Sequence, residues 1–118
     1  MIEQSEPDAQ LLRIFIGELD KYNHQPLYEA LVHACKSQGL AGATVLRGIL
    51  SYGASSRIHT AKLLDLSFDL PIVVEIIDES QKIDAFLETA NKMIEEAGGG
   101  ALITIENIRV IHYRSKKH

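Results

Sequence analysis

The chain has 118 residues, the length of one ordinary domain, and its 46% hydrophobic and 24% charged residues are typical of a globular protein with its own core. A net charge of -4 argues against a general nucleic-acid binder, which needs a basic face to displace counterions from phosphates. The single cysteine, Cys35, cannot form an internal disulfide, so a reducing cytoplasm is the expected location. No apolar run approaches the roughly 18 residues needed to cross a bilayer, and no direct insertion into a membrane is expected.

The first part of the chain predicts a lead-in, a strand and a helix. Residues 1–10 are acidic and polar and are expected to be disordered. Apolar residues alternate over 11–17, which predicts a strand, and a polar connection follows it. Pro26 suits the first turn of a helix, because its missing N–H costs nothing there. Apolar residues then recur at helical spacing as far as Gly39, which is expected to end the helix.

Two further strands are predicted around a long polar connection. Residues 43–50 favour a strand, in which Gly48 indicates a bulge or a close approach of another backbone segment. Residues 51–69 are polar, with only a weak helical pattern, and a connection of this length in a small domain is typical of a functional or mobile loop. Pro71 opens a third strand over 72–77, whose nearly continuous apolar sequence indicates a central place in the sheet.

The last part of the chain predicts a helix, a strand and a tail. Asp78 or Ser80 is expected to cap a helix whose apolar residues recur at i, i+3, i+4 and i+7. Gly98–Gly100 ends it. A final strand is predicted over 102–113, and the change of alternation at 106–107 indicates a bulge or a break. Residues 114–118 form a short basic tail.

The resulting order, β-α-β-β-α-β, predicts an α+β fold, a ferredoxin-like sandwich over residues 11–113. Two right-handed crossovers would place both helices on one face of a four-stranded antiparallel sheet. The apolar residues of the second and third strands exceed what one helical layer can bury. The other face of the sheet is therefore expected to pack against further copies of the chain.

Several segments carry a resemblance to a known family. The run Gly42–Ile49, then Gly53, His59 and the segment Asp69–Ile76, resembles the PII-like family named as domain of unknown function number one hundred and ninety. The plan is more distantly similar to the nitrogen-regulatory PII proteins. Those proteins are homotrimers that bind adenine nucleotides between subunits and signal to a partner through a mobile loop. The resemblance implies a PII-like homotrimer that is not an enzyme, with AMP, ADP, ATP or a related anion as ligand and a partner such as a membrane transporter.

The resemblance also implies which residues bind the ligand. Gly98–Gly100 resembles the glycine turn of PII proteins, whose backbone amides approach a phosphate, although a simple helix cap explains the same glycines. PII proteins place a lysine where this chain has Ala101. They have Arg-x-Arg where this chain has His112-Tyr113-Arg114, and a lysine where it has Ile72. The loss of cations favours a less charged ligand such as AMP, or another small anion.

Residues of the polar connection 51–69 complete the candidate ligand-binding set, and the alternative interpretation is that this connection is simply a solvated loop. The candidate ligand-binding residues are Gly48, Gly53, Ser55, Arg57, His59, Gly98, Gly99, Gly100, His112 and Arg114.

Two rival functions use the same fold. A trimeric metal-binding protein resembling the CutA family needs ligands that converge between subunits, since the spacing of the histidines matches no zinc pattern. A small ferredoxin-like enzyme needs a perturbed acid. Glu75 is the acid inside an apolar strand, and it is expected either to act as a base or to pair with Arg47 or Arg109. Cys35 lies on an apolar helical stripe and is expected to be a core residue rather than a nucleophile.

Overall fold

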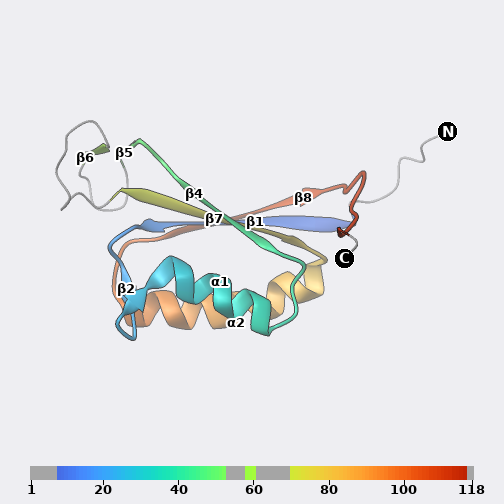
Figure 1. The fold of residues 1–118 in the computed structure, drawn as a ribbon, viewed down its shortest axis with the longest axis horizontal. Helices are drawn as coiled ribbons and strands as arrows, with labels where there is room; N and C mark the ends of the chain where they lie inside the picture. Colours follow the sequence, from blue (N-terminus) through green and yellow to red (C-terminus); the bar gives the residue numbers. More distant parts are fainter. Residues whose placement is uncertain (1–7, 53–57, 61–69, 117–118) are drawn as a thin grey trace.

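The structure is a computed structural model that describes residues 8–52, 58–60 and 70–116 of the chain. Two helices lie on one face of a four-stranded antiparallel sheet with the order β4-β7-β1-β8 (Figure 1). This arrangement confirms the predicted ferredoxin-like α+β fold. Its elements are β1 (Ala9–Gly17), α1 (Leu27–Ser37), β4 (Ala43–Arg47), β7 (Pro71–Asp78), α2 (Ser80–Ala97) and β8 (Leu102–Ile108).

The core lies between the two central strands and the helices. Alternate residues of β1 and β7 face the helices, in the register Leu12↔Ile76 and Ile14↔Val74, and all four are fully buried. Phe86 of α2 packs in the same cluster. Each large apolar side chain buried in this way stabilises the fold by about 1.5–3 kcal/mol. The central position of β7 explains its almost continuous apolar sequence, as expected.

The end of α1 agrees with the sequence. Gly39 has a left-handed φ of +80°, and the N–H of Leu40 donates to the Cys35 carbonyl at 3.2 Å. This hydrogen bond, with the left-handed Gly39, forms the Schellman-type motif in which a glycine ends a helix. β1 begins at Ala9, so the last two residues of the segment 1–10, which was expected to be a disordered lead-in, belong to this strand.

The start of α2 differs from the prediction. Its N-cap is Glu79, and no side chain caps it, so the predicted capping by Asp78 or Ser80 is wrong. Asp78 is still part of β7, and its carboxylate has other partners. It accepts hydrogen bonds from the N–H of Glu79 and from the N–H of Ala41, both at 2.8 Å. Asp78 therefore ties the start of α2 to the segment that leads into β4.

The last strand is shorter than predicted. β8 pairs with β1 in continuous register from Leu102↔Phe15 to Ile108↔Ala9 and then ends, because β1 offers no further residue. The pairing runs through Glu106 and Asn107 without interruption, so the predicted bulge or break at 106–107 is wrong, and the strand ends only after Ile108. Residues 109–116, called the C-terminal segment below, have no regular structure. The N–H of Val110 donates to Asp8 at 3.1 Å and holds this segment beside the start of β1.

Two small hairpins were not predicted. β2 (Lys21–Tyr22) and β3 (Gln25–Pro26) pair across Asn23 and His24, which both have positive φ, as a two-residue turn of the primed type requires. β5 (Leu50–Tyr52) pairs with β6 (Ile58–Thr60) in a separate two-stranded sheet. The predicted second strand therefore ends at Arg47, and the weak helical pattern near 61–64 lies outside the described residues.

The helices leave one face of the sheet uncovered (Figure 1), called the open face below. This face carries exposed apolar side chains. Leu46 is 48% exposed, Ile77 45% and Leu102 56%. Phe15 and Val73, whose strands place them on the same face, are half-buried. Apolar residues are therefore in surplus on this face, but Val45, Ile72, Val74 and Ile76 of the second and third strands, on which the expectation rested, pack toward the helices instead.

Candidate functional site

One end of the sheet gathers the glycines that the sequence marked as candidates. β1 ends there, β4 ends there, and β7 and β8 begin there, because β7 is antiparallel to both β1 and β4 and β8 is antiparallel to β1. The N–H of Glu18 donates to the Leu70 carbonyl at 2.8 Å and closes this edge. We call it the glycine end, and it contains Gly48 and Gly98–Gly100.

Gly48 is required by a close approach, as expected. A Cβ atom at this position would lie 2.7 Å from Cγ of Pro71, and the Gly48 N–H donates to the Pro71 carbonyl at 2.8 Å. A larger residue would push β4 away from the start of β7. The fold alone therefore explains this glycine.

The turn after α2 has two structural constraints. Gly98 has a φ of +77°, and its N–H donates to the Ile94 carbonyl at 3.1 Å, which confirms it as the cap of the helix. Gly99 lies directly against the carboxylate of Asp20. A Cβ atom on Gly99 would be 2.7 Å from Oδ1 and 2.8 Å from Oδ2 of that residue. The glycine turn thus faces a carboxylate.

Sequence reasoning missed Asp20, which lay in what was predicted as a plain polar connection. The turn that holds it is well fixed. Its Oδ2 atom accepts the N–H of Gly17 at 3.0 Å, and its backbone carbonyl accepts the N–H of Leu27 at 2.8 Å. Asp20 therefore links the end of β1, the start of α1 and the glycine turn.

A cation also lies at the glycine end. Arg47, the last residue of β4, forms an ion pair with Glu18 and is more than half exposed. Nothing in the local sequence around Arg47 indicates Glu18 as its partner. Among the predicted loop residues, Gly53, Ser55 and Arg57 lie outside the described residues, and His59 is placed only as the middle residue of β6.

The two remaining candidates, His112 and Arg114, lie at the opposite end of the sheet. β8 carries the chain away from the glycine end over seven residues, a distance of about 20 Å. Figure 1 shows the red C-terminal segment at the end of the sheet away from β5 and β6. His112 and Arg114 line a pocket of about 560 Å³ together with Ser115 and Lys116. Within one chain, the predicted site residues therefore form two separate groups.

A larger pocket, of about 650 Å³, lies between the C-terminal segment and strands β4 and β7. Its walls combine apolar residues with carboxylates, and His112 reaches this pocket as well. These acidic and apolar walls are formed by Asp8, Glu75, Ile77, Asp78, Glu79, Val110 and Tyr113. The mixture of acidic and apolar walls is less suited to a phosphate than the basic pocket beside it.

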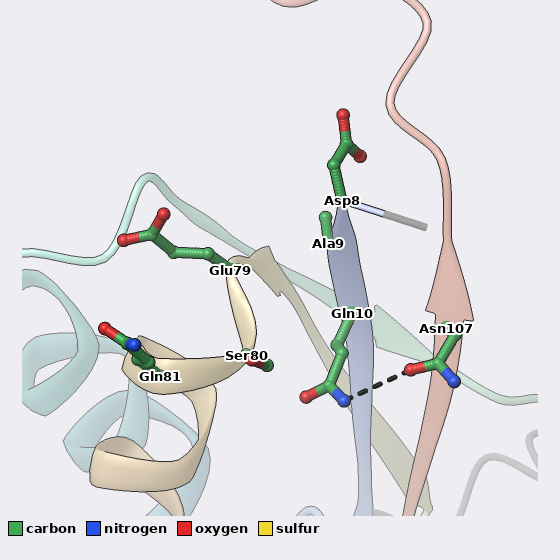
Figure 2. Close-up of a pocket in the computed structure, with 7 residues that line it drawn as sticks. All are labelled: Asp8, Ala9, Gln10, Glu79, Ser80, Gln81 and Asn107. Atoms are coloured by element: carbon green, nitrogen blue, oxygen red, sulfur yellow. Dashed lines mark hydrogen bonds between the residues drawn. The ribbon is translucent and has the colours of Figure 1, made fainter. Parts of the chain in front are cut away.

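A third pocket, of about 390 Å³, lies beside the start of α2 (Figure 2). Figure 2 shows the side chain of Gln10 meeting that of Asn107 across neighbouring strands, and Nε2 of Gln10 donates to Oδ1 of Asn107 at 3.2 Å. The Oε1 atom of Gln10 is buried and has no hydrogen-bond donor in the described part of the chain. Asp8 and Glu79 flank the pocket, so it suits a small hydrogen-bond donor better than an anion.

The acid candidate, Glu75, forms an ion pair with Arg13 on the open face. Nε of Arg13 lies 2.9 Å from Oε2 of Glu75, and the same guanidinium also binds Glu106. The predicted pairing of Glu75 with Arg47 or Arg109 is therefore wrong. The hydrogen bond to Glu75, and to a smaller extent the one to Glu106, raises the pKa of Arg13. The strand register places Glu75 directly opposite Arg13 and Glu106 diagonally across from it on the same face, which local sequence cannot show.

Cys35 is buried in the core, as expected, and burial raises the pKa of its thiol. A neutral, enclosed thiol is a poor nucleophile. The described residues contain no group of three or more His, Cys, Asp or Glu side chains that could hold a metal ion. His24, His33 and His112 are exposed and lie apart on different elements. Over the same described ranges, no helix is long and apolar enough to cross a membrane.

Comparison with known proteins places these features in a family. Residues 9–110 match the family model DUF190, described as "Uncharacterized ACR, COG1993". A UPF0166 protein of Aquifex aeolicus is 43% identical over 103 residues, which cover 87% of this chain and 93% of that protein.

Solved structures share the fold. The PII-like protein CPII of Thiomonas intermedia K12, bound to ADP, AMP and bicarbonate, superposes with a TM-score of 0.66 at 16% identity, over 86% of this chain and 87% of that one. The PII protein of Arabidopsis thaliana bound to citrate gives a TM-score of 0.56 at 14% identity, over 86% and 78% of the two chains. These structures support the distant similarity to PII proteins that the sequence indicated. With most of its length matched by the family model, the chain belongs to the DUF190 family.

Proposed function

We propose that the protein is a homotrimeric, non-catalytic sensor of a small ligand, an adenine nucleotide or a related anion. The ligand binds between copies, with the glycine end of one copy facing the C-terminal segment of the next. Binding changes the conformation of the segment after β4, which signals to a protein partner. In PII systems such a partner is a membrane transporter, and the same class of partner is proposed for this chain.

The separation of the two groups of candidate residues is the observation that carries this proposal. Gly48 and Gly99 lie at one end of the sheet, whereas His112 and Arg114 lie about 20 Å away at the other end. A compact nucleotide site that uses both groups needs two copies of the chain. Symmetric assembly supplies the second group without any further residue.

The open face gives the copies a surface to share. Leu46, Ile77 and Leu102 are each about half exposed on it, and apolar side chains of this size gain free energy when they leave water. The ion pair between Arg13 and Glu75 of the same chain lies on the same face. The match in fold to a protein whose structure contains ADP and AMP supports an adenine nucleotide as the ligand.

The first experiment is thermal melting of the purified protein with AMP, ADP, ATP, cyclic AMP, divalent metals and simple anions. A ligand that prefers the native state raises the melting temperature. We expect a rise with an adenine nucleotide that the Arg114→Ala variant loses. The matched control is Arg109→Ala, which removes an exposed cation five residues earlier and should keep the shift. A shift with metals alone would overturn the proposal in favour of a metal-binding protein.

A mixing experiment tests whether two copies share the site. Arg114→Ala removes the C-terminal cation, and Ala101→Trp blocks the exposed position next to the glycine turn. Each variant alone should lose binding. In random mixed trimers, about one interface in four combines an intact turn from one copy with an intact Arg114 from the next, so about a quarter of the binding should return. No recovery in mixed trimers would show that both groups act from the same chain.

A further inference from the structure

The carboxylate of Asp20 lies directly against Gly99 in the glycine turn, where a phosphate was expected to bind. Its two oxygens lie at 2.7 and 2.8 Å from the position that a Cβ atom of Gly99 would take. No side chain larger than hydrogen fits between them. Gly99 is thus explained by this contact, just as Gly98 is explained by its left-handed φ.

The surroundings add further negative charge. The turn follows the C-terminal end of an 18-residue helix, where the free carbonyl groups carry a partial negative charge. The last turn of α2 contains no basic residue and includes Glu95 and Glu96. A phosphoryl group at Gly98–Gly100 would face the carboxylate of Asp20 and the negative end of the helix, whereas Glu95 and Glu96 are exposed and their charges are screened by solvent.

We propose that Asp20 excludes phosphoryl groups from the glycine turn and so sets the specificity of the site. The turn receives an uncharged part of the ligand, and the phosphate binds at the basic C-terminal segment. The site therefore prefers AMP to ADP and ADP to ATP. This inference rests on the proposed nucleotide-binding function and deepens it.

The geometry makes Asp20 a fixed feature of the site and not a passing contact. Gly17 donates to its side chain at 3.0 Å, and Leu27 donates to its backbone carbonyl at 2.8 Å. A phosphate could displace the carboxylate only by breaking the hydrogen bond with Gly17. The Asp20→Asn variant removes the charge and keeps one oxygen that can accept the Gly17 N–H, while the other carboxylate oxygen is replaced by an NH2 donor.

The test compares affinities for adenosine, AMP, ADP and ATP by isothermal titration calorimetry, for the wild type and Asp20→Asn. We expect Asp20→Asn to bind ATP about tenfold more tightly than the wild type, a change of about 1.4 kcal/mol, with adenosine binding unchanged. The matched control is Glu96→Gln, which removes an equal charge from an exposed position in the last turn of α2. We expect it to change ATP affinity by less than about threefold, because exposed charges are screened.

Asp20→Ser provides a second neutral side chain that still accepts a hydrogen bond, in case the asparagine variant does not fold. Each outcome is informative. The wild type could bind adenine nucleotides while the Asp20 variants have the same ATP-to-adenosine affinity ratio as the wild type. That result overturns this inference and leaves the proposed function standing. An equal gain in Glu96→Gln overturns it as well, because the effect would then belong to net charge. Absence of binding of every probe to the wild type and the variants overturns the proposed function together with this inference.

Discussion

Replacement of Leu102 by lysine is expected to dissociate the proposed trimer. Leu102 begins β8 on the open face and is 56% exposed in one chain. Full burial of a leucine side chain stabilises by about 1.5–3 kcal/mol, so covering the exposed half contributes about 1 kcal/mol per copy and about 3 kcal/mol per trimer. Lysine removes this contribution and adds the cost of desolvating a charge. A loss of 3 kcal/mol weakens the association constant by about a hundredfold or more.

The assay is size-exclusion chromatography with light scattering over a dilution series. The wild type should have a mass of three times 13.1 kDa, or about 39 kDa, and Leu102→Lys should shift toward the monomer on dilution. The matched control is Asn107→Lys, an exposed residue of the same strand that pairs with Gln10 on the face toward the helices. It should leave the mass unchanged. A stable trimer of Leu102→Lys with the wild-type dissociation profile would refute the assignment of the open face as the interface.

Three further predictions concern the fold and the site. Gly48→Ala should lower the free energy of unfolding, measured in urea, by about 1–3 kcal/mol, because its Cβ would lie 2.7 Å from Pro71. Gly42→Ala, whose Cβ would have no atom within 4 Å, should be nearly neutral. Equal stability of the two variants would contradict the close approach at Gly48. Because burial raises the pKa of the Cys35 thiol, the unfolded chain ionises first, and stability should fall as pH rises above about 8.5. Cys35→Ala should lack this component of the decline, and identical slopes for the two proteins would count against it. Ala101→Lys adds the cation that PII proteins have beside the turn, and because Asp20 keeps phosphoryl groups away from the turn, it should change the ATP-to-AMP affinity ratio by less than about threefold in calorimetry; a tenfold gain for ATP alone would show that phosphates reach this position.

The fold was predictable because the strongest periodic patterns in the sequence belong to its framework. The i, i+3, i+4 pattern of α2 includes Ile83 and Phe86, which are both fully buried, and the continuous apolar sequence of β7 matches its central place in the sheet. Gly39 and Gly48 were also interpreted correctly. Their local requirements, a left-handed φ and a close approach, are specific to glycine and need no knowledge of distant residues.

The errors concern contacts between segments that are far apart in the sequence. Glu75 pairs with Arg13, 62 residues away, because the register of β1 against β7 places them side by side. Asp78 was expected to cap a helix but binds Ala41 instead. The contact between Asp20 and Gly99 depends on how the turn after β1 meets the end of α2. Nothing in the local sequence of either residue encodes such a meeting, and strand register and turn geometry decide it.

The sheet order also determines what the two outer strands offer. Within the described residues, β4 and β8 each pair on one side only, so each has an edge of backbone N–H and C=O groups that water or another strand must satisfy. β4 has five residues and ends with the charged Arg47, which makes it a poor template for strand addition. β8 has seven residues, with Leu102 and Ile105 exposed. Strand addition at β8 would extend the sheet across the boundary between two chains, and at high concentration the same edge is the place where uncontrolled aggregation would begin.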